Sequence, residues 1–493
     1  MKLYKKLFSR WTGVAMLATM GLFACQPEIE VVAPSSGSAD FTTYIALGNS
    51  LTSGYADGGV YREGQINSFP EMIAKSMQEA GGAKGFKTPL MPEGNGSGYL
   101  KLVGGAPSPV PADPNWLNSV ASGGPYQNMG VPGARVKSLT QVGYGSSVGN
   151  PYYARFASTP LSTVVGEAAA QNPTFFTLWI GNNDILGYAT SGGDQGGDAI
   201  TPTAEFETDL NKILDGMSGA KGAAIVNIPD ILGAPYFKTA PYNAFVVDAA
   251  TAAQVNAGLK GFTTQAATPA ITAGVTAAVK AGAKAQALAG GASEAQAEAI
   301  AEAYIASAEG QAVIAAGVQQ QLAGLLATLP VIVEGANPFI IRGNPSATNP
   351  TGIRSATPED LILLTVLSYT STPAFLALPV LPESLVLDVS EQEKVKAAIT
   401  AYNVVLKAAA ESKGYAYVDM GGFFEKVKSG FSYQGVSYSP TFVTGGAFSL
   451  DGVHLTQRGY ALAGNEIIKA INAKYGSNLS WINTNEYRGI LFP

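Results

Sequence analysis

One serine and one histidine, far apart in the chain, are the residues best suited to covalent chemistry. Ser50 directly follows the apolar run YIALGN, and His454 is the only histidine among 493 residues. A serine hydroxyl is a poor nucleophile at neutral pH unless a base, usually an imidazole oriented by a carboxylate, takes its proton. These residue types predict attack by Ser50 on a carbonyl group, with His454 as the base.

The carboxylate that such a histidine needs stands three residues before it. In LDGVHLTQRGYA, Asp451 precedes His454 by a separation that brings two side chains together within one turn of chain. Thr456 is predicted to cap the following helix, which leaves both residues on the loop before it. The alternative is that a lone histidine has a structural or surface role.

A second serine competes for the role of nucleophile. Ser147 is the centre of GSSVG, which matches the G-x-S-x-G motif. That motif needs a strand before it and a helix after it, and here neither is predicted. Ser50 lacks the second glycine of the motif, because Thr52 stands there, but a strong strand precedes it and nearby glycines allow close backbone approach. We therefore assign the nucleophile to Ser50.

Strands and helices alternate around these residues. Predicted strands cover 42–48, 174–181, 222–230 and 415–420, and predicted helices cover 68–82, 203–217, 391–414 and 456–476. This alternation predicts an α/β domain with a mainly parallel sheet, in two parts over residues 41–239 and 381–493.

The alternation stops between residues 240 and 380. Within 251–330, 27 of 80 residues are alanine, a strong helix former that buries little surface. Ser293 and Gln296 are spaced as a capping box. We expect a mostly helical insertion, either a lid over an apolar site or a decoration of the surface.

Four short motifs occur in a fixed order between residues 48 and 455: GNSLTSG, NMGVPGA, GNND and DGVHL. They resemble blocks I, II, III and V of the GDSL, or SGNH, hydrolase family. The resemblance implies a flavodoxin-like three-layer α/β/α fold and ester hydrolysis by acyl transfer without a cofactor. It also implies that Ser50 is the nucleophile, that His454 is the general base and then the acid, and that Asp451 orients His454.

The resemblance further implies an oxyanion hole. Its donors would be the backbone N–H groups of Ser50 and Gly133, with Gly130 as the fallback for Gly133, and the side-chain amide of Asn183. Such donors typically contribute about 3 kcal/mol each to transition-state stabilisation. Asn49 stands where the family usually has aspartate.

The N-terminus has the pattern of an export signal. Four basic residues precede an apolar stretch over 11–23 that is short for a membrane span, and LFAC at 22–25 resembles a bacterial lipobox. We expect a signal peptide over 1–24, lipidation of Cys25 and a flexible tether over 25–40. Gln26 after the cysteine favours anchoring in the outer membrane of the cell envelope. The alternative is an ordinary signal peptide with a chance cysteine.

The charge balance limits the partners. Loss of the four positive charges of the signal leaves 26 Lys+Arg against 36 Asp+Glu, a net charge of −10. This argues against nucleic acid and leaves the lipid anchor as the membrane contact. One histidine and one cysteine do not supply an ordinary zinc site, so no metal is expected.

These features favour a serine esterase or lipase acting on a small-molecule, lipid or glycan ester. One alternative is a carbohydrate acetyl esterase acting on envelope or dietary glycans. Another is a non-catalytic binding lipoprotein on the same scaffold. The alanine-rich insertion favours longer acyl chains, and the sequence makes no prediction of the oligomeric state.

Overall fold

A parallel sheet forms the centre of the molecule. The computed structural model describes residues 33–346, 349 and 351–490. Within that part of the chain, the largest sheet has five strands in the order β14-β6-β5-β1-β4, and each adjacent pair is parallel. Its strands are β1 (Tyr44–Gly48), β4 (Asn128–Gly130), β5 (Phe175–Trp179), β6 (Gly222–Val226) and β14 (Ala416–Val418). The predicted α/β class with a mainly parallel sheet is confirmed.

The strand order defines where a ligand site belongs. Counted along the chain, the five strands lie in the order 2-1-3-4-5, so the direction of winding reverses between β1 and β5. Sheets of this flavodoxin-like order bind ligands outside the carboxyl ends of the strands at that reversal. Ser50 follows β1 directly, and the GNND motif follows β5.

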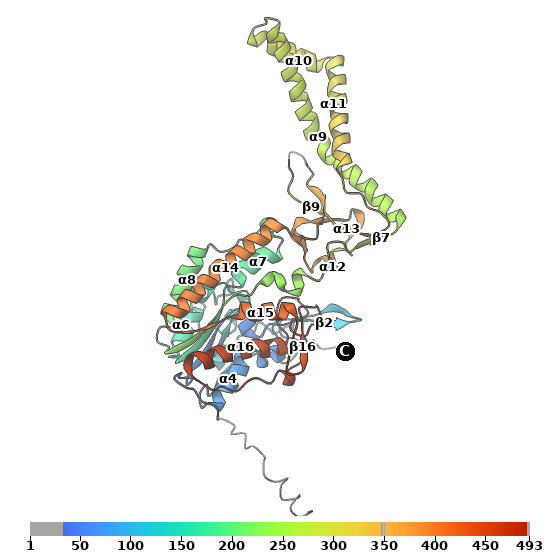
Figure 1. The fold of residues 1–493 in the computed structure, drawn as a ribbon. Coiled ribbons are helices and arrows are strands. Elements are labelled where there is room, and N and C mark those ends of the chain that lie inside the picture. Colours follow the sequence, from blue (N-terminus) through green and yellow to red (C-terminus); the bar gives the residue numbers. More distant parts are fainter. Residues whose placement is uncertain (1–32, 347–348, 350, 491–493) are drawn as a thin grey trace, which may run out of the picture.

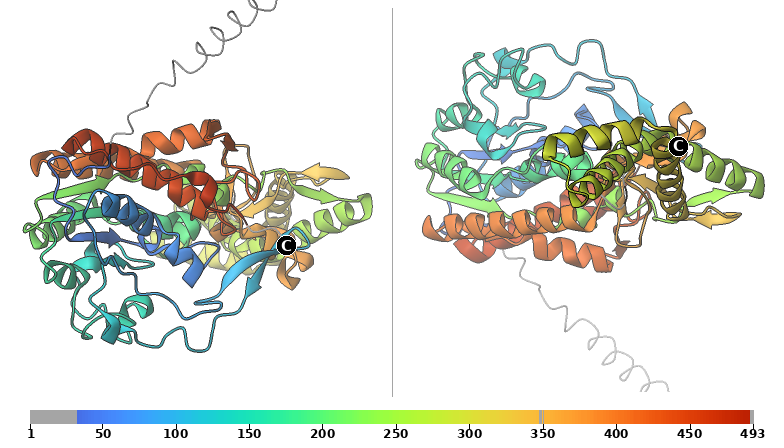
Figure 2. Two further views of the ribbon diagram at one scale, coloured as in Figure 1. Left: turned by 90° about the horizontal axis from the view of Figure 1, so that it is seen from below. Right: turned by 90° about the horizontal axis from the view of Figure 1, so that it is seen from above.

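Helices cover both faces of the sheet and give three layers (Figure 1; Figure 2). One face carries α4 (Phe69–Glu79) and α16 (Gln457–Tyr475), which pack on each other. The other face carries α6 (Val164–Ala169), α7 (Asn183–Thr190), α8 (Thr203–Gly216) and α14 (Val389–Ser412). This arrangement agrees with the expected α/β/α architecture.

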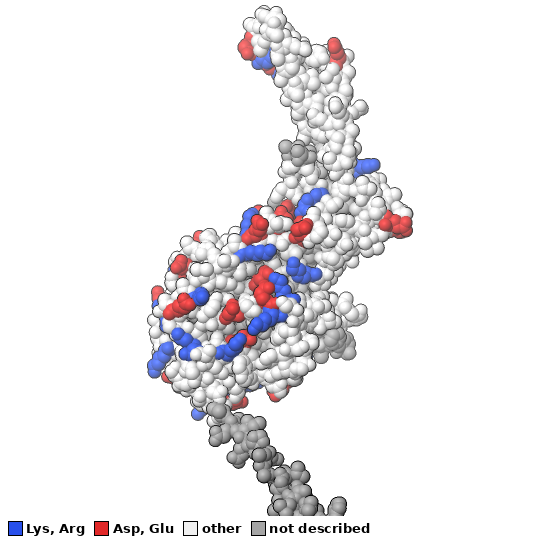
Figure 3. Space-filling view, in the orientation of Figure 1, with Lys and Arg blue, Asp and Glu red and all other residues white. Residues whose placement is uncertain are grey.

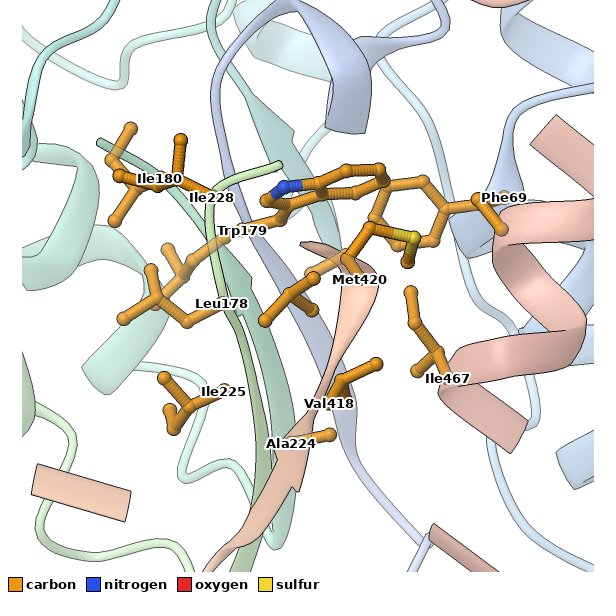
Figure 4. Packing of buried hydrophobic residues seen from close by; sticks show 14 of the residues in the cluster. Phe69, Leu178, Trp179, Ile180, Ala224, Ile225, Ile228, Val418, Met420 and Ile467 are labelled. Carbon is orange, nitrogen blue, oxygen red and sulfur yellow. The ribbon is translucent and has the colours of Figure 1, made fainter. Parts of the chain in front are cut away.

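Alternate residues of β5 fill the two spaces between the layers. Figure 4 shows Leu178 on one side of the sheet and Trp179 on the other, the side on which Phe69 and Met420 are also buried. Trp179 is fully buried, and its ring centroid lies 5.6 Å from that of Phe69. Burying such a side chain contributes about 2 kcal/mol or more, so this packing holds the strand that precedes the GNND motif.

The predicted elements are present, with shorter strands than expected. Thr456 caps α16 by accepting the Gly459 N–H, as predicted. Ser68 precedes α4, but its side chain makes no cap hydrogen bond. The short strand β4 was not predicted. The remaining elements of the α/β body include α2 (Ser50–Ser53), α3 (Arg62–Ile66), β2 (Tyr99–Val103), β3 (Ala106–Val110), α5 (Pro151–Ala154), α15 (Met420–Ser429), β15 (Phe431–Tyr433) and β16 (Val436–Tyr438).

The insertion has an apolar core of its own, formed by residues between Ala240 and Val386. Small strands and short helices surround it: β7 (Phe245–Val247), β8 (Gly335–Asn337), β9 (Ile340–Arg342), β10 (Ile353–Ser355), β11 (Leu361–Ile362), α12 (Val366–Tyr369), α13 (Pro373–Ala377), β12 (Val380–Pro382) and β13 (Val386–Leu387). The insertion is therefore a helical arm built on a small base that also contains strands.

The arm consists of α9 (Ala249–Ala289), α10 (Glu294–Ala306) and α11 (Ala308–Ala327), which pack on one another and extend away from the α/β body (Figure 1). The predicted capping box of Ser293 and Gln296 is present. Ion pairs of Lys280 and Lys284 with Glu298, at 2.6 and 2.9 Å, join α9 to α10. Charged side chains are scarce along the shaft of the arm (Figure 3), since 261–279 and 310–333 contain none.

The described chain begins against the end of α16. Ser35 pairs with Asn478, and the Ser38 N–H donates to the Tyr475 carbonyl at 2.8 Å. The predicted flexible tether over 25–40 therefore does not extend to residue 40, because these backbone bonds hold residues 35–38 on the body. The predicted signal peptide and Cys25 lie outside the described residues. Over the part of the chain that is described, none of the helices has both the length and the apolar character needed to cross a bilayer.

Candidate active site

The fold brings Ser50, His454 and Asp451 into one hydrogen-bonded row. His454 Nε2 lies 2.8 Å from Ser50 Oγ, across 404 residues of sequence. His454 Nδ1 lies 2.9 Å from Asp451 Oδ2. The Tyr55 ring packs on the imidazole, with centroids 4.4 Å apart. The imidazole is thus held between a hydroxyl on one nitrogen and a carboxylate on the other.

Asp451 is fixed by hydrogen bonds to both carboxylate oxygens. Oδ1 accepts the backbone N–H groups of Val453 and His454, and Oδ2 accepts the Gly58 N–H at 2.9 Å. Burial raises the pKa of Asp451, but the interaction with His454 and these backbone donors outweigh it and leave the pKa below its usual value. Asp451 is therefore a carboxylate that accepts the Nδ1 proton and leaves Nε2 free to accept one from Ser50.

The turn that carries Ser50 fits tightly between the two strand ends. A Cβ on Gly48 would lie 2.4 Å from the Trp179 carbonyl and 2.1 Å from Thr52 Oγ1, so only glycine fits there. Asn49 caps α2 by accepting the Leu51 N–H, and its amide donates to Asn182 Oδ1 at 3.3 Å. An aspartate at position 49 could not donate that bond, which joins the ends of β1 and β5.

The structure places some of the expected oxyanion donors, but not all of them, in the cavity beside Ser50. Asn183 lines the same cavity as Ser50 and His454. Its amide donates one hydrogen to the Ala134 carbonyl at 2.9 Å, and an amide has two. That bond sets the loop of Gly133, at φ +78°, beside Asn183, but Gly133 does not line the cavity. The N–H of the fallback, Gly130, donates to Asn128 Oδ1.

Ser147 lies apart from this site. It is on an exposed turn between η2 (Val136–Thr140) and α5, without the strand that the G-x-S-x-G motif needs before it. The structure thus places Ser50, and not Ser147, beside the histidine.

Sequence reasoning missed Asp57, which ties the loop after Ser50 to the loop of Asp451. Its carboxylate accepts the Leu450 N–H at 3.0 Å and the Tyr61 hydroxyl at 2.8 Å. Its own N–H donates to Ser449 Oγ. Burial raises the pKa of Asp57, and the Leu450 N–H opposes that rise. The available signal was an Asp-Gly turn directly after the nucleophile.

Replacing Asp451 with asparagine is expected to lower kcat by about 10⁴-fold. Either orientation of the new amide would direct an NH₂ group at backbone or imidazole N–H donors, so the imidazole loses the carboxylate that sets its tautomer. Steady-state kinetics with a short-chain aryl ester would measure the loss, and the thermal unfolding midpoint would show that the fold is retained. A loss below tenfold in a folded variant would contradict this role.

The fold and site together define a class. A doubly wound α/β sheet with a serine, a histidine and an aspartate in a row at its winding reversal is an arrangement that can activate a serine hydroxyl for attack on a carbonyl group. Residues 44–277 match the model of the family GDSL-like Lipase/Acylhydrolase, and the chain carries a domain of this family. The match contains Ser50, Gly133 and Asn183, whereas Asp451 and His454 lie beyond it. A search of curated proteins found no significant match. The family places the chain among hydrolases that act on esters.

Proposed function

We propose that this protein is a serine esterase that hydrolyses carboxylic esters through an acyl-enzyme. The observation that supports this most directly is the continuous row from Ser50 Oγ to His454 Nε2 at 2.8 Å and from His454 Nδ1 to Asp451 Oδ2 at 2.9 Å. A hydroxyl bonded to an imidazole whose far nitrogen is held by a carboxylate is the arrangement that activates serine.

In the proposed reaction, Ser50 Oγ attacks the ester carbonyl while His454 Nε2 takes its proton. The carbonyl oxygen becomes an oxyanion, for which the free amide hydrogen of Asn183 and the backbone N–H groups of Ser50 and Gly133 are the proposed donors. His454 then gives the proton to the alcohol oxygen as the C–O bond breaks, which leaves an acyl group on Ser50. Water, deprotonated by His454, then attacks this acyl group. The bond between the acyl carbon and Ser50 Oγ breaks, His454 returns the proton to Ser50, and the acid is released.

A fluorophosphonate probe tests this proposal directly, because it phosphonylates an activated serine. We expect stoichiometric labelling of the folded protein, with the adduct on the peptide that contains Ser50. Heat-unfolded protein, in which the row is broken, should not be labelled. A folded protein that stays unlabelled, or that carries its adduct on another serine, would contradict the proposal and favour a binding protein.

We also propose, from the sequence, that the enzyme is attached to the cell envelope through a lipid on Cys25. The described chain starts beside the C-terminal end of α16, near the amino end of β6, where the Tyr475 hydroxyl bonds the Ala223 backbone. Ser50 lies at the carboxyl ends of the strands. An anchor would therefore leave the site on the opposite end of the body, open to a substrate outside the membrane.

A further inference from the structure

The cavity beside Ser50 is small, partly open to solvent and lined mostly by apolar side chains. Its volume is about 50 Å³. Polar groups, including Ser50, His454 and Asn183, line one part of it. Most of the other lining side chains are apolar, among them Leu51, Trp179, Leu186, Ala234, Phe424 and Phe448.

This volume limits what the acyl side of an ester can be. An apolar cavity of about 150 Å³ accommodates benzene, which has six carbon atoms. By the same measure, 50 Å³ beside Ser50 accommodates about two or three carbon atoms. In the proposed reaction the carbonyl carbon would lie beside Ser50 Oγ, which leaves the cavity for the remaining carbons of a short acyl group.

The apolar walls of the cavity are backed by the core. Trp179 is fully buried against Phe69, and Figure 4 shows Met420 on the same side of the ring. Phe448, 5% exposed, packs edge-on against Phe424 at 5.8 Å. Displacing such side chains strains a packed core by about 1–3 kcal/mol, so a longer chain meets a real barrier.

We propose that this esterase is selective for short acyl groups, from acetyl to butyryl, and that Phe424 and Phe448 form the wall that sets the limit. This inference rests on the proposed function. It replaces the expectation of longer chains, which came from the insertion: within the described residues, none of 240–380 lines the cavity.

A second hollow lies on the other side of that wall. It has a volume of about 10 Å³ and shares Asp230, Phe424 and Phe448 with the cavity of Ser50. The ring of Phe424, which is half-buried, therefore stands between the two spaces. Its removal in Phe424→Ala is expected to join them and lengthen the acyl site, whereas Ala234→Val adds two methyl groups at another position that lines the cavity.

The test is a series of p-nitrophenyl esters from acetate through butyrate and hexanoate to octanoate. For the natural enzyme, kcat/KM is expected to fall by about tenfold or more between butyrate and octanoate. Phe424→Ala should raise kcat/KM for hexanoate relative to acetate by about fourfold per additional methylene accommodated. Ala234→Val should lower butyrate turnover relative to acetate.

A matched control is Phe431→Ala, which removes a half-buried ring that packs on Phe423 at 5.8 Å and lines neither hollow. Its chain-length profile should equal that of the natural enzyme. Equal or rising kcat/KM up to octanoate in the natural enzyme would overturn the short-chain inference. The proposed esterase activity would still hold. An unchanged chain-length profile in folded Phe424→Ala would contradict the role of Phe424 in limiting the acyl chain. Absence of turnover on every ester, together with no probe labelling, would instead contradict the proposed esterase function.

Discussion

Replacing Ser50 with alanine is expected to lower kcat for ester hydrolysis by about 10⁶-fold, the loss seen when a triad nucleophile is removed. We expect no other serine to replace Ser50 as the nucleophile, because His454 Nε2 bonds Ser50 Oγ and Asp451 holds the opposite nitrogen. Steady-state assays with p-nitrophenyl acetate would measure the loss, down to a residual rate supported by the oxyanion donors alone.

The matched control is Ser147→Ala, which removes the other candidate serine on its exposed turn. We expect unchanged kcat and KM in that variant. Loss of activity in Ser147→Ala with retention in Ser50→Ala would reverse the assignment of the nucleophile. The two variants are informative as a pair because each removes one hydroxyl and little else.

Loss of the imidazole of His454 is expected to lower kcat about as much as loss of Ser50, since the two act as a unit. The composition offers a second way to remove it: His454 is the only histidine, so a histidine-selective acylating reagent has one imidazole to modify in untagged protein. Full modification should abolish ester hydrolysis, and the number of modified imidazoles is measured by mass spectrometry.

A histidine-free variant, His454→Ala, controls for modification elsewhere. Treated with the same reagent, it should carry one adduct fewer than the natural protein. Its residual activity should not change on treatment. Full activity in natural protein whose imidazole is completely modified would exclude His454 as the base and, with it, the proposed mechanism.

The short-range features of the site follow from the sequence by itself. Asp451 and His454 are three residues apart, and Thr456 caps the next helix, so one turn of chain decides their arrangement. The strand before Ser50 and the glycine at 48 are also local. For the same reason, the α/β class and the capping box at Ser293 could be predicted, because periodicity and capping depend on neighbours in the chain.

The tertiary structure decided what depends on distant segments. The order of the strands places β1 beside β5, and only this brings Ser50 next to Asn183 and, through α16, next to His454. Asp57 was missed because its partners, Leu450 and Ser449, are nearly 400 residues away. No local pattern encodes such a pairing.

The same reason explains what the sequence left open. The end of the predicted tether depends on Asn478 at the far end of the chain. The acyl site depends on the volume left between Trp179, Phe424 and other side chains from separate segments, which is a property of packing and not of any single motif. Residue types and their spacing thus determined which chemistry could be predicted, and the packed fold decided which groups meet and how much space lies beside them.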